Sequence, residues 1–173
     1  MLTKAFAGLR AACAFVSLAL LLALLPRAAA ASAALVLDAR TGSVEAWPAL
    51  TMLADPGGTL GIEAVLAAPQ RFAAPTSARS TLGVQHHPVW LRIPVTVAEG
   101  GPAAWILHID YALLNKVELF VARAGRVSPR ALAGNLQPVA PNVQRVRTPA
   151  MLLDLAPGRH DIYLRIETSG AMV

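Results

Sequence analysis

The sequence holds a single cysteine, Cys13, among its 173 residues. One thiol cannot close an intramolecular disulfide, and Cys13 lies in an apolar N-terminal stretch that we expect to be removed on export. The exported part then offers no thiolate for a metal site or for nucleophilic catalysis. Disulfide scaffolds, cysteine-ligated metals and cysteine enzymes are therefore excluded by composition.

Charged residues are also scarce, at 14% of the chain, and the formal net charge is +5. Three of the cations, Lys4, Arg10 and Arg27, lie in the N-terminal stretch, so the exported part has a net charge of only about +2. No Lys/Arg cluster remains beyond the loosely spaced Arg145 and Arg147. Nucleic-acid binding needs a concentrated basic face, so we expect no nucleic-acid partner.

The longest apolar run is too short to be a membrane helix. Residues 11–25 are uncharged, follow a basic start and end at Pro26. A transmembrane helix needs about 20 apolar residues, so a secretory signal peptide is favoured over a retained membrane anchor. Small residues between 28 and 34 supply peptidase sites. We expect a signal peptide over 1–33 and one exported domain over 34–173.

Period-two alternation dominates the exported part, with aliphatic residues on one face of each segment. Pro94 interrupts one such segment and argues for an edge position or a bulge. Residues 34–38 and 43–47 flank a turn and predict a hairpin or a strand reversal. Many short strands separated by turn residues are typical of an all-β antiparallel sandwich or barrel. The main predicted strands are 89–97, 105–110, 117–122, 151–155 and 161–168.

Only residues 60–68 show helical periodicity, and Pro69 closes the segment. A turn at 55–58 precedes it, and Thr59 is the predicted N-cap. Residues 122–147 are rich in Pro, Gly, Arg and Asn and poorly periodic. They predict long loops that cross from one sheet to the other, with a short strand as an open alternative.

No enzyme or metal motif is present. His86 and His87 are adjacent, so on an extended segment they point to opposite sides and cannot chelate one metal together. The glycine-rich residues 57–61 lack the Lys-Ser/Thr ending of a phosphate loop. The acidic residues show no spacing that marks a catalytic pair. We expect no metal, no cofactor and no catalytic activity in this chain.

A set of polar and aromatic side chains alternates with the aliphatic positions and is expected on the opposite strand faces. Rings that stack on a sugar, with Arg and Asp bonding its hydroxyls, would form a glycan site, and Arg could equally clamp a carboxylate. Alternatively, Trp90 fills the core and Arg92 pairs with Asp110 or Glu118 across strands. The set comprises Trp90, Arg92, His108, Asp110, Tyr163 and Arg165.

Five blocks follow one another along the exported part: LADPGGTLGIEAVL (53–66), LGVQHHPVWLRIPV (82–95), WILHIDYALLNKVELFV (105–121), AGNLQPVA (133–140) and IYLRIETSGAM (162–172). Their succession resembles the type 2 extracellular domain of bacterial seven-transmembrane receptors with diverse intracellular signalling modules (7TMR-DISM). The resemblance implies a jelly-roll β-sandwich similar to carbohydrate-binding modules. In that family the domain lies outside the cytoplasmic membrane, ahead of seven helices and a kinase or cyclase.

The same resemblance implies a function, a location and a site. It implies a ligand-sensing domain in the periplasm or on the extracytoplasmic face of the membrane. The expected ligand is a glycan or a carboxylate, and the expected partners are membrane helices and a signalling module. Whether the domain forms a homodimer is left open. A free periplasmic carbohydrate-binding protein without signalling output is the other interpretation. In that family a final strand and the membrane helices follow the block at 162–172. Since this chain stops at Val173, the resemblance leads us to expect a truncated fragment. Matched to the family's WLR, DY and YLR blocks, the site residues are Trp90, Arg92, Asp110, Tyr111, Tyr163 and Arg165.

Overall fold

The described part of the protein is mostly β structure. The computed structural model describes residues 33–77, 80–128 and 131–172. These ranges contain eleven strands, one short α-helix and two 3-10 turns, η1 (Trp47–Ala49) and η2 (Pro69–Arg71). None of their helices is long and apolar enough to cross a membrane. The predicted signal peptide falls almost wholly outside the described residues.

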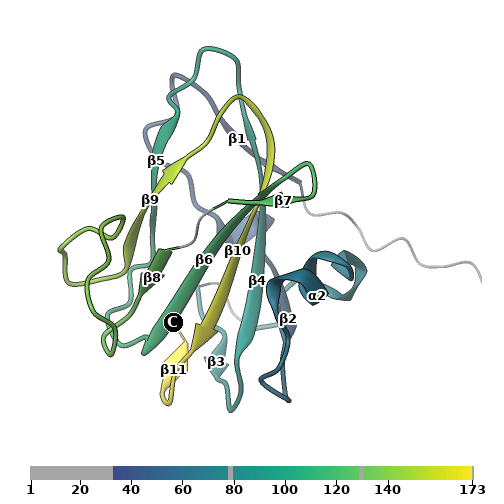
Figure 1. Cartoon of the computed structure of the whole chain (residues 1–173), viewed down its shortest axis with the longest axis vertical. Helices are drawn as coiled ribbons and strands as arrows, with labels where there is room; N and C mark the ends of the chain where they lie inside the picture. The colour runs from purple at the N-terminus through teal and green to yellow at the C-terminus, as the bar shows by residue number, and fades with distance from the viewer. Residues whose placement is uncertain (1–32, 78–79, 129–130, 173) are drawn as a thin grey trace, which may run out of the picture. The chain divides into compact units, whose positions relative to one another are not determined.

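A seven-stranded mixed sheet forms the framework. Its three longest strands lie side by side, with β10 (Gly158–Glu167) between β4 (Val89–Val97) and β6 (Lys116–Arg123) (Figure 1). Both pairings are antiparallel, and β10 forms a continuous ladder with each of its two neighbours. Four short strands complete the edges, β1 (Leu35–Leu37) and β2 (Thr51–Ala54) on β4, and β7 (Arg126–Val127) and β8 (Ala131–Ala133) on β6.

The first strand corrects the predicted hairpin. β1 pairs in parallel with β4, and residues 43–46 form no strand. The chain turns at Asp38, whose carboxylate accepts hydrogen bonds from the N–H of Arg40 at 2.8 Å and from the hydroxyl of Thr41 at 3.0 Å. This local turn satisfies polar groups without a returning strand. The sheet is therefore mixed rather than purely antiparallel.

Pro94 does not mark an edge strand, because β4 is paired on both sides. The outer side of β4 changes partner at this point, since β2 pairs as far as Arg92 and β1 begins opposite Val95. Proline has no N–H to donate to a ladder, so it is tolerated where no strand stands beside it. The proline thus separates two short edge strands.

The second layer is an antiparallel ribbon of β5 (Ala104–His108) and β9 (Ala150–Asp154), which packs on one face of the main sheet. A further pair, β3 (Gly83–Val84) with β11 (Ala171–Met172), forms a ladder of its own, and Met172 packs in the core between the layers. The predicted aliphatic faces are confirmed as the core between the layers; jelly-roll connectivity stays a prediction. That core includes Leu91, Ile93, Val95, Val117, Leu119, Val121, Met151, Leu153, Ile162, Leu164 and Ile166.

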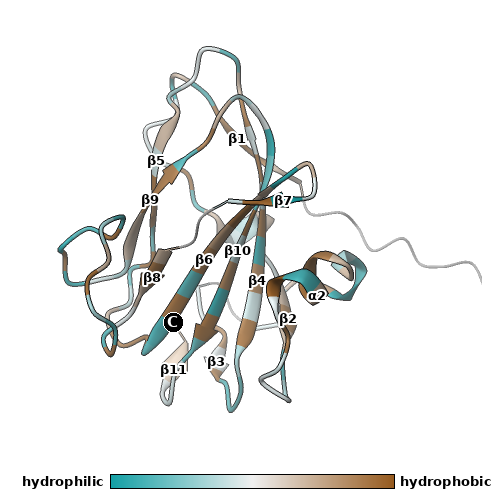
Figure 2. Ribbon diagram, viewed as in Figure 1, coloured by the Kyte–Doolittle hydropathy of each residue, from teal (hydrophilic) through white to brown (hydrophobic). Residues whose placement is uncertain are grey.

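The other face of the main sheet is covered by α2 (Ile62–Leu66). Val65 of this helix is fully buried against a second apolar cluster that contains Trp90, Phe120 and Tyr163. Figure 2 shows apolar residues on the side of α2 nearest to β2 and polar residues on its far side. The predicted helix is confirmed in place, although it is shorter than expected.

The predicted cap of this helix is wrong. Gly61 is the N-cap residue and makes no side-chain cap bond. The side chain of Asp55 instead accepts the N–H groups of Thr59 at 3.3 Å and Leu60 at 3.0 Å. An aspartate that bonds the backbone a few residues ahead stabilises a turn. Asp55 therefore shapes the loop that enters α2.

We expect Gly134→Ala to lower the free energy of unfolding by about 2 kcal/mol or more. Gly134 has φ +130°, and a Cβ there would lie 2.4 Å from the carbonyl oxygen of Asn115. Chemical denaturation measures the loss. Gly42→Ala is the matched control, since nothing lies within 4 Å of its Cβ position, and it should change stability by less than about 0.5 kcal/mol. Equal losses in both variants would contradict this account.

Candidate functional site

Four of the six predicted site residues come together on the face of the main sheet that α2 covers. Trp90 and Arg92 belong to β4, and Tyr163 and Arg165 belong to β10. In the ladder, Arg165 stands opposite Trp90 and Tyr163 stands opposite Arg92. The alternation read from the sequence therefore assigned these four side chains to one face correctly.

A pocket of about 650 Å³ opens on this face, and we call it the α2 pocket. The loop that enters α2 forms one wall together with the start of the helix, and β6 with the end of β7 forms another. Two of the predicted residues, Trp90 and Arg165, line it, whereas Arg92 and Tyr163 do not. Its lining comprises residues 58–63, Trp90, Glu118, Phe120, Val127, Ser128 and Arg165.

Arg165 links the sheet to the loop that enters α2. Its side chain is only 12% exposed, and its guanidinium contacts Glu118 at 3.2 Å and also Glu167. The second terminal nitrogen donates to the carbonyl oxygen of Gly58 at 3.1 Å. Lys116 completes the network, with Nζ 3.1 Å from Glu118 and 3.6 Å from Glu167. Arg165 is thus already neutralised before any ligand arrives.

Trp90 contributes an unused hydrogen-bond donor. The residue is 1% exposed, and its ring centroid lies 5.5 Å from that of Phe120. Its indole Nε1 is buried and has no hydrogen-bond partner. Buried N–H groups are nearly always paired, so the unpaired N–H of a residue that lines a pocket calls for an explanation. Trp90 was predicted as a core residue or a ligand contact, and its position is compatible with both.

Arg92 is engaged in an ion pair beside the pocket. Its Nε and Nη2 lie 2.9 Å and 2.8 Å from Oδ1 of Asp161. The predicted partners, Asp110 and Glu118, are therefore wrong. Tyr163 is buried next to this pair; burial raises the pKa of its phenol, Asp161 raises that pKa further, and Arg92 opposes the shift.

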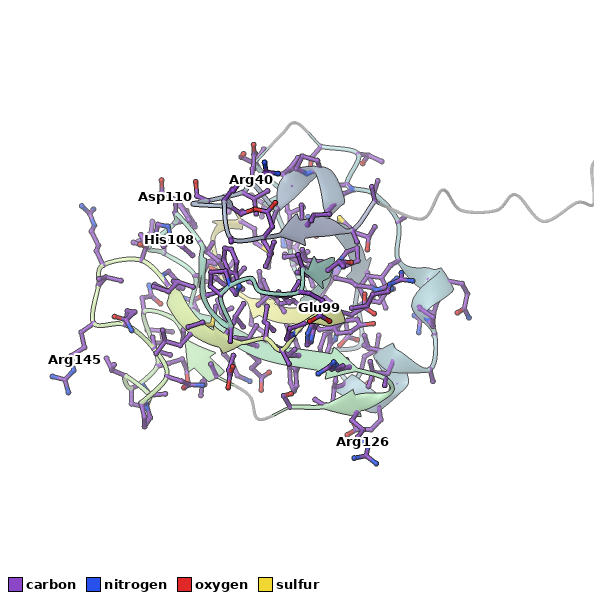
Figure 3. All side chains as sticks on the ribbon, turned by 90° about the horizontal axis from the view of Figure 1, so that it is seen from above. Arg40, Glu99, His108, Asp110, Arg126 and Arg145 are labelled. Atoms are coloured by element: carbon purple, nitrogen blue, oxygen red, sulfur yellow. The ribbon has the colours of Figure 1, made fainter. Side chains whose placement is uncertain are left out.

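The remaining predicted residues lie elsewhere. Figure 3 shows His108 and Asp110 close together, on the side of the view away from α2. Asp110 lines a different pocket, of about 490 Å³, between the main sheet and the ribbon. Tyr111 packs against the core between the layers, and His108 shares a 2.7 Å hydrogen bond with Thr148. The six residues therefore do not form a single site.

Two acidic residues of the α2 pocket were missed as site residues. Glu118 follows the same alternation along β6 as Phe120, so its face could have been predicted from the sequence. Glu63 could not, because nothing in the sequence indicates which face of the sheet α2 covers. Glu63 lies exposed in the first turn of α2, and among the described residues its carboxylate has no hydrogen-bond or ion-pair partner.

A comparison with protein-family models gives a match for most of the chain. Residues 48–173 match the family model described as 7TMR-DISM extracellular 2. No curated protein matches the chain. The matched segment contains every residue that lines the α2 pocket. Within the described ranges, no group of three or more His, Cys, Asp or Glu side chains could hold a metal ion.

We expect Arg92→Ala to lower the free energy of unfolding by about 1 kcal/mol, because the pair with Asp161 is partly exposed to solvent. A double-mutant cycle with Asp161→Ala should give a coupling of about 0.5 to 1 kcal/mol. Arg40→Ala, at an exposed pair with Asp38, serves as the control and should cost less. Additive effects of Arg92→Ala and Asp161→Ala would show that the ion pair contributes nothing.

Tyr163 should titrate above the ordinary tyrosine pKa of about 10 in the folded protein. A raised folded pKa means that the stability from this group is complete below pH 10 and is lost as the pH rises through the folded value. The chain has two tyrosines, so Tyr111→Phe leaves Tyr163 as the sole reporter of tyrosinate absorbance. A folded midpoint at or below that of the denatured protein would refute the burial argument.

Proposed function

The chain belongs to the 7TMR-DISM extracellular 2 family, and on that basis we propose that it senses a carbohydrate in the α2 pocket. Membership of this family implies an extracytoplasmic, non-catalytic sensor domain in a membrane receptor. The proposal adds the ligand class and the place where the ligand binds. The observation that carries it is a pocket lined by Trp90, whose buried indole N–H is unpaired, and by Glu63 and Glu118.

A sugar suits this combination of groups. Each hydroxyl of a sugar both donates and accepts hydrogen bonds. Carboxylates such as Glu63 and Glu118 accept from hydroxyls, and the indole N–H of Trp90 donates to a hydroxyl or ring oxygen. A volume of about 650 Å³ falls within the usual range for small-molecule sites. The pocket therefore supplies acceptors and a donor for a ligand with several hydroxyls.

The charges of the pocket favour a sugar over a carboxylate ligand. In the part of the chain that the structure describes, Arg165 is the only Lys or Arg that lines the pocket, and it is already paired with Glu118 and Glu167. The carboxylate of Glu63 carries a second negative charge without a partner among the described residues. An anionic ligand would meet this uncompensated charge, and like charges repel. A neutral sugar would not.

Ligand binding in this pocket would bias the position of α2. The pocket is bounded by the sheet through Trp90 and Glu118 and by residues 58–63, which form the loop before α2 and the start of the helix. A ligand that contacts both walls stabilises the arrangement in which they face each other. In a receptor, this shift in population is the event that attached membrane helices and a signalling module would transmit, as the sequence resemblance leads us to expect.

The proposal predicts selective loss of binding in Glu63→Gln and Trp90→Phe. A printed glycan array identifies a sugar that binds the wild-type protein, and calorimetric titration of that sugar measures affinity. Each variant removes one ligand hydrogen bond and should weaken binding by about tenfold. Glu99→Gln, an exposed glutamate in the turn after β4, is the matched control and should leave affinity unchanged. The proposal fails if no glycan binds, or if all three variants bind alike.

A further inference from the structure

β5 is bonded to a neighbour along one edge only. Next to this strand, the N–H of Ile109 donates to the carbonyl of Pro149, and the carbonyl of Ala103 accepts from Leu155. Bonded and non-bonded pairs alternate along an antiparallel ladder. The odd-numbered residues of β5 therefore bond to β9, and its even-numbered residues direct their N–H and C=O groups away from β9.

The partner strand supports this assignment. On β9, the N–H of Leu152 donates to Asn142 at 2.9 Å, and the carbonyl of Ala150 accepts from Gln144 at 2.8 Å. The even-numbered residues of β9 thus bond outward to the segment that covers its far edge. β5 has no equivalent cover, because no described residue bonds to the outward backbone groups of its even-numbered residues.

An apolar groove runs along the free edge of β5, and we call it the β5 groove. Two pockets, of about 730 and 490 Å³, share Ala46, Ile93 and Leu107 in their linings. One wall is β5 and the other includes residues 41–46, which form no strand. Its apolar lining includes Leu37, Leu91, Ile93, Val95 and Leu164. The groove offers apolar contacts beside the unpaired backbone groups.

The edge lacks the usual protection against a further strand. Natural edge strands carry Lys, Pro, a bulge or inward charges that block pairing. β5 has none of these, and its ladder to β9 continues without a break. Ile106 is 56% exposed and stands opposite Leu152, which is 42% exposed. Two apolar side chains thus meet on the outer face of the ribbon.

The charged residues of the β5 groove select one kind of occupant. Among the described residues, its titratable lining residues are Glu45, His108 and Asp110, and none of the described Lys or Arg residues lines it. A strand with acidic residues would meet the like charge of Asp110, whereas Lys or Arg would meet its opposite charge. A second copy of β5 would bring another Asp110 and no Lys or Arg from 98 to 115. The charges therefore disfavour self-pairing.

We propose that the free edge of β5 is a docking site for an extended segment of a partner protein, which adds to the ribbon as a third strand. The backbone groups of the even-numbered residues supply the ladder, and the β5 groove receives every second side chain of the segment. The partner segment is apolar at alternate positions and carries Lys or Arg rather than Asp or Glu. This site is separate from the α2 pocket and does not depend on a sugar ligand.

The test uses two labelled peptides of alternating valine and threonine, one ending in lysines and the other in glutamates. Fluorescence anisotropy should show that the full chain binds the lysine peptide and binds the glutamate peptide at least about fivefold more weakly. Ile106→Pro removes an N–H that points away from β9, so the ribbon can still form while the added ladder is interrupted. This variant should weaken binding by about tenfold.

Ile106→Thr is the matched control, because it removes the exposed apolar side chain but keeps the N–H; binding of the lysine peptide should stay within about threefold.

Amide exchange provides a second measurement that needs no variant. The N–H groups of Ile106 and His108 should exchange quickly in the free protein and slowly with the lysine peptide. Protection before peptide is added, equal affinity of both peptides, or unchanged binding by a folded Ile106→Pro variant overturns the proposal. Self-association that Ile106→Pro abolishes would assign the edge to a second copy instead.

Discussion

The network around Arg165 is the interaction on which the α2 face depends. Arg165 occupies the central strand of a sheet that is covered on both faces, and a buried guanidinium must be paired to be tolerated. Glu118 and Glu167 supply the charge, while the carbonyl of Gly58 supplies a further acceptor. The hydrogen bond from Arg165 to Gly58 therefore holds the loop that enters α2 close to the sheet.

The α2 pocket follows from this arrangement because the cover on the sheet is short. A helix of five residues buries Trp90 and Phe120 but leaves a gap toward β7. On the other face, the ribbon also covers the sheet only in part, because its two strands are narrower than the seven-stranded sheet. The β5 groove lies beside them. The α2 pocket and the β5 groove thus have a common origin, which is the incomplete cover on each face of the main sheet.

The sequence predicted the faces of the long strands well and their neighbours poorly. Alternation assigned Trp90, Arg92, Tyr163 and Arg165 to one face because side chains alternate strictly along a strand. It could not identify Asp161 as the partner of Arg92, since that contact depends on register between strands far apart in the chain. His108 and Asp110 were grouped with the wrong residues, because β5 pairs with β9 in a separate ribbon and its outward face is not a face of the main sheet. The parallel pairing of β1 is likewise a long-range choice that local pattern does not encode.

The break at Pro94 gives the edge of the main sheet two independent parts. β1 and β2 contact different halves of β4, so either can separate without breaking the bonds of the other. Local unfolding of proteins commonly occurs in such small cooperative units. Release of β1 would leave the cluster under α2 covered, whereas release of β2 would remove Leu53 from beside Trp90 and loosen that cluster. The two halves of one edge therefore differ in their cost of opening, and only the half that contains β2 is coupled to the α2 face.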